Sequence, residues 1–322
     1  MRDILGIVAA TPTLEPFDGS TRLMLAAILL ASQRVEEGLT ELDALLGRAG
    51  TSAPNRIVFS VRSMRSAALS VLGRHAEAAE ESLALAGAIA AEHGAGEFGA
   101  LRARASRAQN LVQLGSFDET DAECRALIKA AAGLGRAQAS VVHCSARNAL
   151  VLSLVGRGRA VEGEAEAREA IRLASVPELP GCTYPVALHI GLARTLIAQG
   201  RHAEGLQTAQ ASEEAYVGRP DAKIPLAAAV RLAIGTAQLG LARLDEARQA
   251  TDLALADCRA SLGPRHHRML EAGTLDGRLL AAEGRIVEAR EQLASNVAAW
   301  LQYFGADHPN TRAAEIALAA VR

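Results

Sequence analysis

Five basic side chains recur at one spacing and form the sharpest chemical feature of the sequence. They are Arg62, Arg104, Arg147, His189 and Arg231, separated by 42, 43, 42 and 42 residues. A guanidinium binds a carboxylate or a phosphate through two parallel hydrogen bonds. This basic column therefore predicts a cationic stripe for an acidic peptide or a phosphorylated segment. The alternative is that its members lie along packed stems and pair with neighbouring glutamates.

The histidines and cysteines form no recognisable metal or redox pattern. His266 and His267 are adjacent, as are His143 and Cys144, and adjacent residues of a helix point in different directions. No third ligand stands at a standard spacing, so no metal site is predicted. No two cysteines have the C-x-x-C spacing of a redox site. They are Cys124, Cys144, Cys182 and Cys258.

The sequence also lacks catalytic and cofactor-binding motifs. It contains no Walker A loop, G-x-S-x-G elbow, H-E-x-x-H motif or dinucleotide-binding glycine fingerprint. We therefore predict that the chain is not an enzyme and holds no cofactor. The less favoured alternative is an enzyme or small-molecule binder that uses a groove as its site.

The composition narrows the class of protein. Half of the 322 residues are hydrophobic, 22% are charged and 3% are aromatic, with Trp300 as the single tryptophan. The chain is rich in alanine and leucine, two residues with high helix propensity. A net charge of −2 gives no sign of the clustered basic excess that nucleic-acid binding requires. We see neither a secretory signal nor an apolar run of the roughly 20 residues that a membrane helix needs, and scattered cysteines suit a cytoplasmic protein.

A phrase close to Gly-Arg-x-x-Glu-Ala repeats along the chain and indicates the elements that carry these residues. Its glutamates are at 77, 119, 162, 204, 246 and 288, in steps of 42, 43, 42, 42 and 42, and a weaker first copy contains Glu37. The glycine can end one helix in the left-handed conformation, and the carboxylate can start the next helix beside its positive end. Each phrase is therefore predicted to be the turn of a helix hairpin. Positive φ is expected at Gly73, Gly115, Gly158, Gly200 and Gly284.

This period predicts seven hairpins and a final capping helix. First helices are expected near 20–31, 56–72, 98–114, 140–155, 184–199, 224–240 and 267–283. Second helices are expected near 34–47, 76–92, 118–132, 160–174, 202–216, 244–260 and 286–303, with a last helix near 309–322. The predicted fold is an all-α, right-handed superhelical solenoid. We expect one repeat domain over 20–322 after an N-terminal extension over 1–19.

The glycine turn followed by glutamate and alanine resembles the tetratricopeptide repeat, whose usual period is 34 residues. A 42-residue period is similar to the subclass found in kinesin light chains and in the sensor arrays of bacterial regulators. The junctions at 262–266 and 304–311 resemble that subclass's Leu-Gly-x-x-His-Pro junction. The basic column departs from the family, which usually has tryptophan or leucine at that position. The resemblance implies that ligands bind on the concave face, which first helices line.

The repeat register selects the residues expected on this concave face. The polar ones are Arg102, Gln109, Asn148, Arg194, Glu271 and Arg278. In the fifth and sixth copies the register predicts an apolar floor of Ala187, Ile190, Gly191, Ala229, Leu232 and Ala233. Such a floor suits an apolar or helical peptide segment. The alternative is a tightly wound superhelix that buries the floor itself.

We therefore predict a cytoplasmic scaffold or adaptor whose groove binds a protein or a peptide, either acidic or with an apolar segment. A nucleic-acid or membrane partner is not expected. The alternative is a sensor module, like the repeat arrays of bacterial transcriptional and signalling regulators, that acts on a separate effector chain. The sequence leaves the oligomeric state open.

Overall fold

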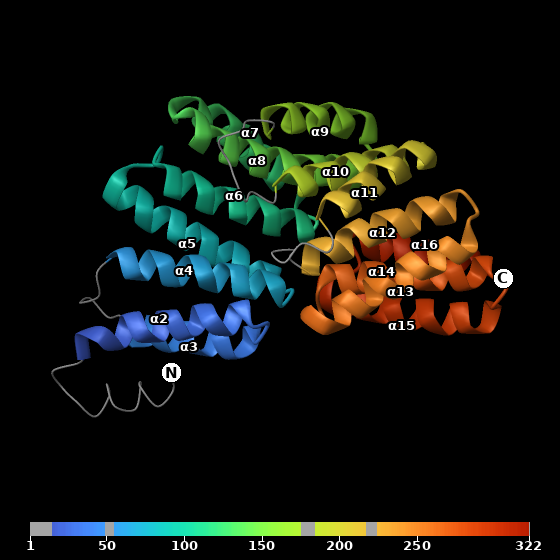
Figure 1. The fold of residues 1–322 in the computed structure, drawn as a ribbon, viewed down its shortest axis with the longest axis horizontal. Coiled ribbons are helices and arrows are strands. Elements are labelled where there is room, and N and C mark those ends of the chain that lie inside the picture. Colours follow the sequence, from blue (N-terminus) through green and yellow to red (C-terminus); the bar gives the residue numbers. More distant parts are fainter. Residues whose placement is uncertain (1–14, 49–54, 175–183, 217–223, 322) are drawn as a thin grey trace.

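The computed structural model describes residues 15–48, 55–174, 184–216 and 224–321, and these segments consist of helices joined by short turns (Figure 1). No strand occurs in the described residues, so the predicted all-α repeat fold is confirmed. The helices are α2 (Glu15–Ala31), α3 (Val35–Arg48), α4 (Asn55–Val71), α5 (His75–His93), α6 (Phe98–Gln113), α7 (Phe117–Ala130), α8 (Arg136–Gly156), α9 (Ala160–Ala174), α10 (Tyr184–Ala198), α11 (His202–Tyr216), α12 (Ile224–Gly240), α13 (Leu244–Ser261), α14 (His267–Ala282), α15 (Ile286–Phe304) and α16 (Pro309–Ala320). The first helix begins at Glu15, earlier than the expected residue 20, and a short 3-10 turn, Ala131–Gly133, follows α7.

Each hairpin packs on the next to form a stack of two helical layers. Every helix packs against its neighbours in the sequence, and the first helices from α6 to α14 also pack against one another. The second helices α7, α9, α11, α13 and α15 form the outer layer. The core between the layers consists mainly of leucine and alanine side chains, whose small size allows close helix approach. The stack curves from α2 through α8 and back to α16, as Figure 1 shows.

The hairpin turns have the conformation that the repeated phrase predicts. At the five expected glycines φ lies between +74° and +80°. At Gly73 the turn is closed by Gly73 N–H donating to Ser70 O and Arg74 N–H donating to Leu69 O, which is the Schellman pattern. In the first and sixth hairpins the same position holds Gln33 and Ala242, with φ of 62° and 58°.

Helix α8 is the one helix in the described ranges with the length and apolar character of a membrane span. Of its apolar window, 56% is buried inside the stack. Leu150 and Leu154 of this helix are almost fully buried against α6 and α7. Burial of this extent is typical of a core helix in a repeat array.

Candidate functional site

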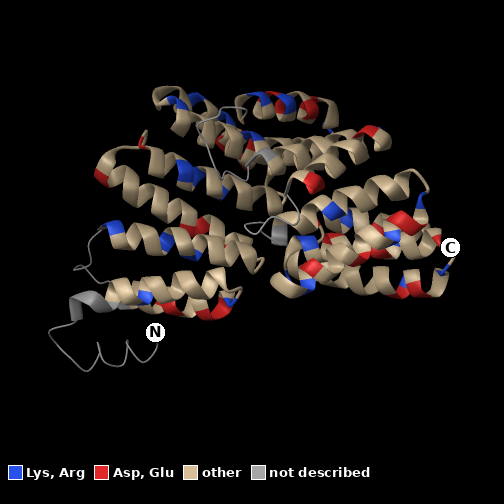
Figure 2. Ribbon diagram, viewed as in Figure 1, with Lys and Arg blue, Asp and Glu red and all other residues tan. Residues whose placement is uncertain are grey.

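The basic column is engaged in ion pairs within its own hairpins. Its three arginines on α4, α6 and α8 each bond a glutamate that lies 19 residues later on the second helix, and Arg22 of the first hairpin does the same. The pairs are Arg22–Glu41, Arg62–Glu81, Arg104–Glu123 and Arg147–Glu166. Figure 2 shows basic and acidic residues interspersed along the helices. These contacts favour the packing interpretation of the column, and its role as a cationic stripe for a ligand stays a prediction.

The last two members of the column, His189 and Arg231, have other neighbours than the first three. Arg231 bonds Asp257 of α13 and lies 3.4 Å from a carboxylate oxygen of Glu213 on α11. His189 is half-buried on α10 and lies outside the concave pocket defined below. The column stands five residues before the repeat position of Arg194 and Thr236, which line that pocket, and five residues rotate a side chain by about 140° around a helix. That rotation turns the column from the groove toward the second helix.

Three other predicted groove residues link or pack the helices. Gln109 Nε2 donates to the Ser145 carbonyl oxygen at 2.7 Å, and Asn148 Nδ2 donates to Gln109 Oε1 at 3.3 Å, which joins α6 to α8. Ile190 is 5% exposed and belongs to the core between α10 and α12. Arg102 is exposed on α6 and lines a hollow of about 840 Å³ between α4, α5 and α6.

Two hairpin turns touch the far end of the chain and close the superhelix. His75 Nε2, at the start of α5, lies 3.0 Å from His267 Nδ1, at the start of α14. His308 Nε2, just before α16, donates to the Gln113 carbonyl oxygen at the end of α6, at 3.0 Å. The residues in these pairs are 192 and 195 positions apart in the sequence. We call these two interactions the closure contact.

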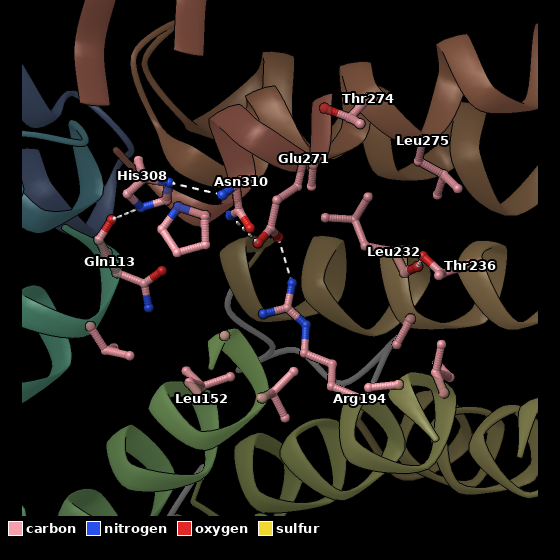
Figure 3. A pocket seen from close by; sticks show the side chains of 18 of the residues that line it. Gln113, Leu152, Arg194, Leu232, Thr236, Glu271, Thr274, Leu275, His308 and Asn310 are labelled. Carbon is pink, nitrogen blue, oxygen red and sulfur yellow. Dashed lines mark hydrogen bonds and ion pairs between the residues drawn. The ribbon is translucent and has the colours of Figure 1, made fainter. Parts of the chain in front are cut away.

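The closed superhelix encloses a pocket of about 310 Å³ on its concave side (Figure 3). First helices α6 to α14 contribute to its lining, and α15, α16 and His308 complete it. We call it the concave pocket, and its lining includes Gln113, Leu152, Arg194, Ile197, Ala198, Leu232, Thr236, Glu271, Thr274, Leu275, Arg278, Trp300, His308 and Asn310. The predicted groove residues Arg194, Leu232 and Arg278 therefore meet here.

One repeat position supplies the centre of this lining. Ten residues before the repeated glutamate stand Leu152, Arg194, Thr236 and Arg278, and all four line the concave pocket. Since equivalent residues of stacked repeats lie in a row, these side chains run across α8, α10, α12 and α14. The register argument and the pocket thus select the same face of these first helices.

A polar network spans the pocket between α10, α14 and the start of α16. Arg194 Nη2 donates to Glu271 Oε2 at 2.6 Å, and Asn310 Nδ2 lies 3.5 Å from Glu271 Oε1 (Figure 3). His308 Nδ1 accepts a hydrogen bond from Asn310 N–H at 3.2 Å, which caps α16 as its junction predicts. The ring therefore carries its proton on Nε2 and is neutral. Burial also lowers the pKa of His308.

The remaining polar side chains of the pocket support its walls. The Thr274 hydroxyl donates to the Leu270 carbonyl oxygen and accepts from Asn296 Nδ2 at 2.7 Å and from Trp300 Nε1 at 3.3 Å. Trp300 is fully buried and stacks on His308 with ring centroids 5.3 Å apart. These contacts fix the wall formed by α14 and α15.

Beside the pocket, the described residues contain one group of three potential metal ligands, His75, His266 and His267. The third member, His75, could not be predicted from spacing, because it is distant from His266 and His267 in the chain. Asn110 Oδ1 lies 2.9 Å from His75 Nδ1, and His266 Nδ1 accepts from Arg268 N–H. His75 thus presents a lone pair at Nε2 to a proton on His267, and His266 holds its proton on Nε2. The hydrogen bonds therefore assign the group as a neutral packing contact rather than a ligand set.

The sequence-based reasoning missed the residues that α15 and α16 contribute to the pocket. Trp300, His308 and Asn310 reach the site only because the superhelix closes. The local signal at His308 was its junction motif, which predicted a helix cap and not a pocket wall.

Two solved structures share this architecture at low sequence identity. A Rap protein complexed with competence and sporulation factor has a TM-score of 0.58 at 12% identity, over 89% of this chain and 77% of that chain. A tetratricopeptide repeat protein from Parabacteroides merdae has a TM-score of 0.50 at 10% identity, over 94% of this chain and 97% of that chain. No protein-family model matches the sequence, and no curated protein matches it either. The structural likeness shows a TPR-like helical repeat fold.

Proposed function

We propose that the chain is a binding scaffold whose concave pocket holds a peptide or a segment of another protein. The observation that carries the proposal is the row of equivalent positions on α8, α10, α12 and α14 that opens into one enclosed pocket. In the similar Rap structure the protein is complexed with competence and sporulation factor. We further assign the array to the 42-residue subclass of tetratricopeptide repeats, on the spacing of its turns and its two Leu-Gly junctions.

The lining suits a short segment with an apolar side chain. Leu232 of the predicted apolar floor lines the pocket together with Ile197 and Leu275, and these three residues form its apolar floor, while the network around Arg194 and Glu271 provides polar contacts. A pocket of about 310 Å³ lies at the lower end of the range for ligand sites and fits one or two side chains. The bound segment would then continue along the groove.

The closure contact favours a sensor role as the second candidate function. A ligand in the concave pocket touches both α6 and the start of α16, which the closure contact joins. A ligand that fits only the closed array would favour that state by its differential affinity. The closed array would then act on a separate effector chain and so transmit the signal that a ligand is bound. The described cysteines, Cys124, Cys144 and Cys258, are buried, and we propose a cytoplasmic location, where cysteines serve as small hydrophobic side chains.

The proposal is tested by filling the pocket. Ala198 is exposed and lines the concave pocket, so Ala198→Phe places a ring there without disturbing the core. Ala256→Phe is the matched control, because Ala256 is an exposed alanine on outer helix α13. Heptapeptides are first selected on the wild-type protein from an N-acetylated, C-amidated library and then titrated by calorimetry. We expect Ala198→Phe to weaken binding at least tenfold and Ala256→Phe to leave it unchanged; equal affinities for the three proteins would overturn the proposal.

A further inference from the structure

Most polar side chains of the concave pocket already have partners in the folded protein. Arg194, Glu271 and Asn310 bond one another, and His308 uses both ring nitrogens. Thr236 and Thr274 donate to carbonyl oxygens of their own helices. Within the described chain, the side chains of Arg278 and Gln113 are the two polar groups of the lining without a hydrogen-bond partner. These two groups are therefore free to contact an occupant.

Arg278 differs from the other charged residues of the lining. It lies on α14, two turns after Glu271 and on the same face, because Glu271, Thr274, Leu275 and Arg278 follow helical spacing. Its side chain reaches solvent, yet protein surrounds it, as expected for a residue facing an enclosed lumen. Burial alone lowers the pKa of Arg278, and no carboxylate of the described residues compensates it.

The charges of the pocket leave one positive charge uncompensated. Arg194 and Glu271 form an ion pair at 2.6 Å and cancel each other, and the His308 ring is neutral. Arg278 contributes the remaining charge. Elsewhere in the array the guanidinium groups of the basic column are matched by glutamates of the same hairpin. An arginine that lines a concave pocket beside apolar side chains and has no carboxylate partner is suited to bind an anion.

We propose that the occupant of the concave pocket is anionic and that Arg278 binds its carboxylate beside the apolar floor of Leu232 and Leu275. This inference rests on the proposed function and names the class of segment: an acidic residue next to an apolar residue. The Arg278 guanidinium donates two hydrogen bonds to the carboxylate. The Gln113 amide is available to the peptide backbone of the same segment.

The test compares two heptapeptide libraries that differ only in the fixed residue, glutamate or its uncharged isostere glutamine, with acetylated and amidated ends. Binding is measured on wild type, Arg278→Gln, Arg278→Lys and the control Arg125→Gln. Arg125 is an exposed arginine of outer helix α7. We expect wild type and Arg125→Gln to prefer glutamate peptides at least tenfold. Arg278→Gln should lose this preference and Arg278→Lys should keep part of it, because the lysine retains charge but lacks the planar fork.

The outcomes separate this inference from the proposed function. Wild-type binding that Ala198→Phe abolishes, but without a preference for glutamate, would refute the anionic occupant and leave the binding scaffold intact. A glutamate preference that survives in Arg278→Gln would refute the role of Arg278. If no heptapeptide of either library binds wild type, both the proposed function and this inference fail. Circular dichroism checks that each variant is folded, and Arg278→Lys provides the charge-retaining comparison.

Discussion

The closure contact is sensitive to a single methyl group at Gly73. A Cβ on Gly73 would lie 2.7 Å from the Cα of His266, 2.8 Å from its N and 2.9 Å from the carbonyl carbon of Arg265. These are backbone atoms, so they cannot rotate away as a flexible side chain can. Gly73→Ala should therefore separate the start of α5 from the start of α14.

Gly158→Ala provides a matched control. Gly158 occupies the same position of its hairpin with φ of +74°, against +76° at Gly73, and a Cβ there would meet nothing within 4 Å. Both substitutions put an L-residue in the left-handed region, which costs about 1–2 kcal/mol. Only Gly73→Ala adds a steric overlap, and overpacking costs about 1–3 kcal/mol. We expect Gly73→Ala to be the more destabilising by about that second amount.

Urea unfolding followed by circular dichroism measures the difference, and small-angle X-ray scattering measures the size of the folded protein. Gly73→Ala should also raise the radius of gyration, because the ends of the superhelix move apart, whereas Gly158→Ala should leave it unchanged. Equal free energies of unfolding for the two variants, together with equal radii, would refute the closure contact.

Three further predictions concern the histidines, the turns and the hairpin ion pairs. Burial lowers the pKa of His75 to about 4 from 6.5, so folding favours the neutral ring, and His75 should contribute a loss of about 2 kcal/mol in stability as pH drops from 7.5 to 5, in addition to the losses from His266 and His267, whose pKa values burial also lowers. His75→Gln should flatten this loss in urea unfolding, and His93→Gln, at an exposed histidine, should not. Ala242→Gly should raise the unfolding free energy by up to about 1 kcal/mol, because Ala242 has φ of 58°; a lowered melting temperature would contradict this. A double-mutant cycle of Arg104→Ala and Glu123→Ala should give a coupling free energy of about 0.5–1 kcal/mol in stability. The variants should bind the selected peptide as tightly as wild type; weaker binding would favour the interpretation of the basic column as a ligand-binding stripe.

The helices and their turns could be predicted from the sequence because their causes are local. Glycine at φ near +75° ends the first helix of five hairpins, and the glutamate of the repeated phrase bonds the arginine three residues before it, as in Arg74–Glu77 at 2.5 Å. Both features lie within one phrase. Their period therefore fixed the helix positions to within a few residues.

The candidate site could be predicted only in part. Helical register placed Arg194, Leu232 and Arg278 on the concave face, and the structure brings all three to one pocket. The basic column stands five residues before the repeat position of Arg194 and Arg278, and its partners, such as Glu81 of Arg62, lie on the second helix. The closure contact depends on small rotations between hairpins that add up over five repeats, and no local pattern encodes that sum.

The single tryptophan offers the most direct test of the binding site. Trp300 is the only tryptophan of the sequence and lies in the wall of the concave pocket, against His308 and Thr274, so its fluorescence reports on that wall. A heptapeptide selected on the wild-type protein is titrated into wild type, Ala198→Phe and Ala256→Phe. We predict a saturable change of Trp300 emission in wild type and Ala256→Phe, and none in Ala198→Phe. Calorimetric binding to all three proteins, with Trp300 emission unchanged, would contradict a ligand site in the concave pocket.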